Sequence, residues 1–193
     1  MIMTLAAFLT AVLGLLLTPG PTNTLMGLAG ASAGLRRVAR LLPAEILGYL
    51  TTILPLAFMG HSLLADFPMV AQATKLAAAA WVMILAVKLW GHGSLAQAGG
   101  DITARRVYAT TALNPKALII ALVLLPSPAA PEFAGRLALF CMTAASVAMI
   151  WGGAGCLAQR GQGGMGRMAV IQRAASVWLA LVSVMLVAGV VRA

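Results

Sequence analysis

The chain has 193 residues, of which 62% are hydrophobic and only 9% are charged, against about 25% charged residues in a typical soluble domain. This composition excludes a soluble globular protein, because too few charged side chains exist to cover a water-facing surface, and it indicates a polytopic membrane protein. The formal charge of +9 does not indicate nucleic-acid binding, because the basic residues lie between apolar segments and form no water-facing stripe.

Charge-poor segments mark the expected membrane spans. The first, residues 1–35, has no charged side chain and no basic stretch before its apolar part, so we expect a retained helix and not a signal peptide. Five more follow along the chain: 46–65, about 69–90, about 107–126, 137–159 and 174–191. We therefore predict an all-α integral membrane protein with six transmembrane helices and one transporter domain, residues 1–193.

The basic residues between these segments predict an orientation. Nine lie in alternate connections, on one side of the membrane: Arg36, Arg37, Arg40, Lys88, Arg105, Arg106, Arg160, Arg167 and Arg173. Only three lie on the other side: Lys75, Arg136 and Arg192. Because positive loops stay in the cytoplasm, we expect both termini outside.

The odd number of spans in each half predicts inverted repeats. Repeat 1 covers about residues 1–92 and repeat 2 about residues 105–193, each with three spans, so the two would cross the membrane in opposite directions. Secondary transporters often have this plan. The first span of each repeat is broken by proline, which supports the pairing.

The break in the first span is polar and lacks helix-forming residues. It reads Thr18, Pro19, Gly20, Pro21, Thr22 and Asn23. The prolines and the glycine free backbone carbonyls, which lipid cannot satisfy, so the segment must face protein or a water-filled cavity. The helix that starts after the break presents a positive N-terminus, which can hold a carboxylate.

The break in the fourth span reads Asn114, Pro115 and Lys116. Asn114 is a natural N-cap before a proline. The charge of Lys116 near mid-span costs at least about 2.5 kcal/mol, so it should face the interior, a cavity or a partner. The alternative is that the prolines are ordinary kinks and that Lys116 only binds freed carbonyls.

Glu45 is the one carboxylate expected within a span, near the cytoplasmic end of segment 46–65. It is either an interfacial group near Arg40 or a site for proton coupling or for a substrate ammonium. Tyr49 follows one turn later on the same helix face, where it either bonds into the cavity or packs.

The two broken segments resemble the LysE superfamily of amino-acid exporters, including its homoserine/threonine branch. The resemblance rests on Thr18-Pro19-Gly20-Pro21, on Asn114-Pro115-Lys116-Ala117 and on the stretch Lys75–Trp81, and it extends over nearly the whole chain. It implies export of an amino acid or similar solute driven by the proton gradient, through a site that involves Pro19, Gly20, Pro21, Asn114, Pro115 and Lys116. The family often has Asn or Asp where Thr22 stands, and Gly-Asp where Gly48-Tyr49 stands; Glu45 is the candidate replacement for that acid.

We therefore expect a secondary exporter of an amino acid or related zwitterion in the bacterial cytoplasmic membrane. The alternatives are an inorganic cation permease and, less favoured, an assembly factor or intramembrane enzyme. No cofactor, resident metal, catalytic residue or nucleic-acid partner is expected. The expected partners are a small-molecule substrate and the lipid bilayer, and a homodimer stays open.

Overall fold

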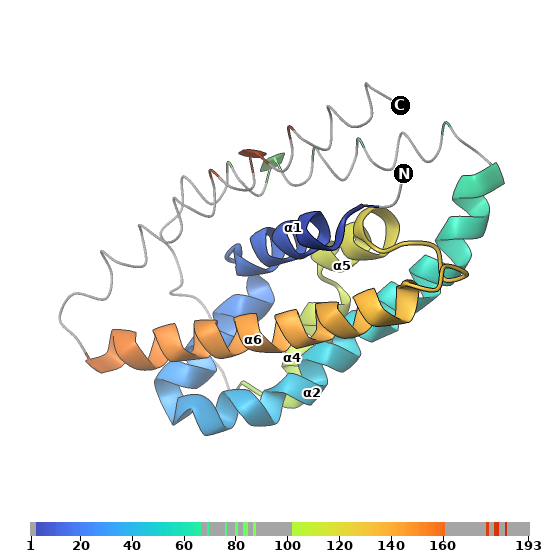
Figure 1. The fold of residues 1–193 in the computed structure, drawn as a ribbon. Helices are drawn as coiled ribbons and strands as arrows, with labels where there is room; N and C mark the ends of the chain where they lie inside the picture. Colours follow the sequence, from blue (N-terminus) through green and yellow to red (C-terminus); the bar gives the residue numbers. More distant parts are fainter. Residues whose placement is uncertain are drawn as a thin grey trace.

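The structure, a computed structural model, describes residues 3–66 and 102–160, with single positions within 69–87 and 177–184. The regular elements of this part are all helical (Figure 1): α1 (Leu5–Leu17), α2 (Pro21–Asp66), α4 (Ala104–Ala112), α5 (Pro115–Ile119), the π-helical η1 (Ile120–Leu124) and α6 (Phe133–Arg160). The predicted all-α class is confirmed for these residues. Apart from the single positions, the expected spans at about 69–90 and 174–191, and the stretch Lys75–Trp81, lie outside the described residues.

Long apolar helices indicate an integral membrane protein. Among the described residues, Pro21–Met59 and Phe133–Gln159 are long and apolar enough to cross a membrane, and the bent pair Ala104–Ala112 and Pro115–Leu124 makes a third if it is one span. Large apolar side chains project from α2 and α6, with Leu47, Met142 and Leu157 all more than half exposed. A bilayer would cover such side chains.

α2 consists of two helices that meet at Gly34. This residue has φ 76° and ψ 176°, a backbone conformation that side chains with a Cβ rarely adopt, and the chain turns there (Figure 1). Arg36, Arg37 and Arg40, expected in a connection between spans, lie in helix beyond this turn. Alanine, leucine and arginine are good helix formers, so one glycine is enough to make the turn.

Both predicted helix breaks are present. α1 ends at Leu17 and α2 begins at Pro21, which has no N–H to lose at a first helical position. In the second half α4 ends at Ala112 and α5 begins at Pro115, with a bend of 48° between the two helices. The expected span 107–126 is therefore one bent pair of helices, Ala104–Leu124.

Glycines let α2 and α6 pack with their backbones in contact. A Cβ at Gly155 would lie 1.9 Å from the carbonyl oxygen of Gly27, and a Cβ at Gly30 would lie 2.0 Å from that of Gly152. Neither position has room for a methyl group. The α2–α6 contact therefore fixes one wall of the bundle, against which α1 and α4 pack.

Gly155→Ala should destabilise the protein by about 1–3 kcal/mol, because the added methyl group forces the two backbones apart. The matched control is Gly153→Ala, since a Cβ at this position of the same helix meets nothing within 4 Å. Thermal unfolding in detergent measures both. Equal unfolding midpoints for the two variants would contradict the close contact.

Candidate functional site

The two helix breaks lie side by side and are joined by hydrogen bonds. The Asn114 Nδ2 donates to the Thr22 Oγ1 at 3.3 Å, and the Thr22 and Thr111 hydroxyls are 3.1 Å apart. The Thr111 hydroxyl donates its single hydrogen to the Val107 carbonyl at 2.8 Å, so Thr22 is the donor to Thr111. A directed chain thus runs from Asn114 through Thr22 to Thr111, and it fixes the two breaks relative to each other.

The carbonyls freed at the end of α1 bind two side chains from elsewhere. Lys116 Nζ donates to the Thr18 carbonyl at 2.7 Å and, more weakly, to the Leu16 carbonyl at 3.5 Å. Asn23 Nδ2 donates to the same two carbonyls at 2.8 Å and 2.6 Å. The ammonium therefore lies at the negative end of α1, as the alternative reading of Lys116 expects.

Lys116 is held from its backbone as well. The Asn114 Oδ1 accepts from the Lys116 N–H at 3.1 Å, which caps α5, and only 3% of Lys116 is exposed. A Cβ at Gly20 would lie 3.3 Å from Lys116 Nζ, tighter than ordinary contact. Gly20 therefore leaves the room that the ammonium occupies.

Glu45 faces the interior and not an exposed interface. Its side chain is 2% exposed, and its Oε2 has no hydrogen-bond partner among the described residues. The charges of Glu45 and Lys116 act on each other, but no direct ion pair joins them in the described part of the chain. A buried carboxylate oxygen is costly to leave unpaired, so a hydrogen-bond donor from outside the described residues would be stabilising at this position.

Tyr49 packs in the core. Its ring meets Phe140 of α6 edge to face, with centroids 5.3 Å apart, and the residue is 1% exposed. Gly48 lies against α4, where a Cβ would be 2.7 Å from the Tyr108 carbonyl oxygen. An acid in place of Tyr49 would face an aromatic ring. Among the described carboxylates, Glu45 is the one that interacts electrostatically with Lys116.

The structure brings most of the predicted site residues together. Four of them are buried and linked by hydrogen bonds at the breaks: Thr22, Asn23, Asn114 and Lys116. Glu45 is buried on α2, within electrostatic reach of Lys116. The remaining members of the predicted set are less enclosed: Pro19, Gly20 and Pro115 are half-buried, and Pro21 is exposed.

Two threonines of this region were not predicted. Thr111 continues the hydrogen-bond chain, and Thr52 donates to the Ala112 carbonyl at 2.6 Å, at the end of α4. The signal for Thr111 was its position one turn before Asn114 in an otherwise apolar span. Thr52 has no comparable signal, because its partner is 60 residues away.

Thr22→Val should lower the free energy of unfolding by about 1–3 kcal/mol, because it leaves the Asn114 amide without its buried acceptor. Valine matches threonine in shape, so packing is kept. Thr10→Val is the control, since the exposed Thr10 hydroxyl bonds only within α1. Thermal unfolding in detergent should separate the two; an unchanged midpoint for Thr22→Val would refute the link between the breaks.

Comparisons with protein-family models, with curated proteins and with solved structures found no match to this chain. The resemblance to the LysE superfamily therefore stays a prediction from the sequence.

Proposed function

We propose that this protein is a secondary transporter that exports an amino acid or a related small zwitterion across the bacterial cytoplasmic membrane, coupled to protons. The proposed architecture has six spans in two inverted repeats, with helices 1 and 4 broken and both termini outside. The observation that carries the proposal is the burial of two ionisable side chains of opposite type: Lys116, which bonds to the Thr18 carbonyl where the two helix breaks meet, and Glu45, which lies within electrostatic reach of it on α2.

A zwitterion fits this arrangement because it carries the complementary charges at short range. Its ammonium would replace Lys116 at the Thr18 carbonyl and approach the Glu45 Oε2, which has no hydrogen-bond partner among the described residues. Lys116 would then pair with the carboxylate of the substrate. Since Asn23 also bonds the Thr18 carbonyl, the end of α1 keeps a donor while Lys116 moves.

Proton coupling would use the same pair. A zwitterion and a proton compete for the Glu45 carboxylate, so binding of one favours release of the other. That exchange is what an exporter driven by an inward proton gradient requires. The coupling needs no further ionisable group within the described site.

Transport by the purified protein in proteoliposomes tests the proposal. A panel of radiolabelled amino acids is trapped inside, and efflux is followed with and without an imposed proton gradient. Gradient-dependent efflux of at least one zwitterion supports the proposal. It fails if no zwitterion moves, and movement of inorganic cations alone would establish the permease alternative.

A further inference from the structure

A polar cavity lies at the turn of α2, apart from the residues of the helix breaks. It has a volume of about 540 Å³ and includes three arginines and one serine in its lining: Ser32, Arg36, Arg37 and Arg40. The helix before Gly34 contributes only small side chains to the wall, Ala29, Ser32 and Ala33, which leaves the space open. The turn therefore creates both the cavity and its basic lining.

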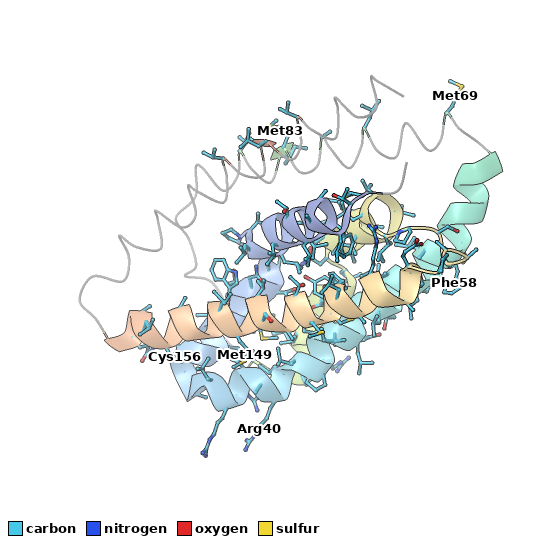
Figure 2. The ribbon with its side chains drawn as sticks, in the orientation of Figure 1. Arg40, Phe58, Met69, Met83, Met149 and Cys156 are labelled. Carbon is cyan, nitrogen blue, oxygen red and sulfur yellow. The ribbon has the colours of Figure 1, made fainter. Side chains whose placement is uncertain are left out.

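The positive charge of this cavity is not neutralised within the described part of the chain. No acidic residue among the described ones lines it. Arg37 Nη2 donates to the Ile102 carbonyl at 2.9 Å, which positions this guanidinium and leaves its other N–H groups available. Arg36 and Arg40 are exposed and one helical turn apart, so they lie on one face, and Figure 2 shows Arg40 extending away from the other helices.

We infer that this cavity binds the phosphate group of an anionic ligand. Arginine forks pair with two oxygens of a phosphate at once, and three of them surround one space here. The volume is within the roughly 300–1,000 Å³ of small-ligand sites, so a phosphate ester fits with its substituents.

The phosphate belongs either to the headgroup of an anionic phospholipid or to a soluble phosphate compound. The proposed orientation puts the turn at the cytoplasmic surface, where basic pockets meet anionic headgroups. The inference goes beyond the proposed transport function, because it does not depend on the cargo and the cavity shares no residue with the Glu45–Lys116 pair.

A titration in detergent tests the cavity and distinguishes the two sources. The thermal unfolding midpoint is followed against phosphatidylglycerol in mixed micelles, with phosphatidylcholine as the zwitterionic reference. A parallel arm uses sodium phosphate and glycerol 3-phosphate against sodium chloride at equal ionic strength. A saturable rise with phosphatidylglycerol identifies a lipid, and one with the soluble phosphates alone identifies a soluble ligand.

The double variant Arg36→Gln/Arg40→Gln should lower the apparent affinity for the ligand that gives saturation at least about tenfold. The control variant Arg105→Gln/Arg106→Gln removes the same charge at the start of α4, outside the cavity lining. It should change the apparent affinity by less than about twofold. Arg36→Lys/Arg40→Lys keeps the charge and the membrane orientation, and it should retain part of the affinity if the Gln variant fails to fold. The inference is overturned if neither arm saturates, or if the two Gln variants weaken binding equally.

Discussion

Lys116→Met should reduce transport at least about a hundredfold and lower the free energy of unfolding by about 3 kcal/mol. The transport loss follows because no other described cation is buried at the breaks to pair with a substrate carboxylate. The stability loss follows because Glu45 then stays buried without the nearby positive charge of Lys116, and an uncompensated buried ionisable group costs about this much even where no direct ion pair is lost. The end of α1 contributes little to the loss, since Asn23 still bonds the Leu16 and Thr18 carbonyls.

The double variant Lys116→Met/Glu45→Gln separates the two effects. Removing both charges should restore most of the stability, while transport stays lost. Unfolding midpoints in detergent and proteoliposome efflux, measured on the same preparations, check this. If Lys116 only stabilised the freed carbonyls, the double variant would be no more stable than Lys116→Met. Normal transport by the Lys116→Met protein would refute the assignment of Lys116 to the substrate site.

Glu45→Gln should abolish transport against a substrate gradient while it leaves downhill movement of the substrate measurable. Glutamine keeps the size and hydrogen-bonding capacity of the side chain but cannot exchange a proton, so the proton gradient no longer drives efflux. We expect the ratio of efflux with and without an imposed proton gradient to fall to about one. This ratio is insensitive to a simple loss of folded protein.

The matched control is Glu132→Gln. Glu132 is an exposed carboxylate just before α6, outside the site, so its loss removes the same charge without touching the breaks. The control should keep the wild-type ratio. Coupling that survives Glu45→Gln would exclude Glu45 as the coupling group and leave the binding role of Lys116 to be judged separately.

The features predicted correctly from the sequence are those with local causes. The cluster Pro19-Gly20-Pro21 and the pair Asn114-Pro115 disfavour a continuous helix, so both breaks could be placed in advance, whereas the isolated Pro43 and Pro55 lie inside α2. The burial of Lys116 followed from its apolar flanks. Its acceptor did not, because the contact with Thr18 spans 98 residues, and the sequence favoured a functional partner with freed carbonyls as the alternative.

Other features depend on tertiary packing and escaped prediction. The sequence left Glu45 as either an interfacial group near Arg40 or an interior site, and the choice depends on packing, because the helix runs unbroken through both residues and carries Glu45 into the bundle. The turn at Gly34 is a single residue among several glycines, and nothing local distinguishes it. The three arginines beyond it were assigned an orienting role only, because their shared cavity needs Ile102 from the second half of the chain.

The two carbonyls at the end of α1 have consequences for how this protein can change during evolution. Each accepts hydrogen bonds from both Asn23 and Lys116, so either donor alone can satisfy the carbonyls of the break. A lineage that retains Asn23 can replace Lys116, together with Glu45, without losing the break itself. Under the proposed transport function, the fold of the break and the charge of the cargo would therefore be separable traits.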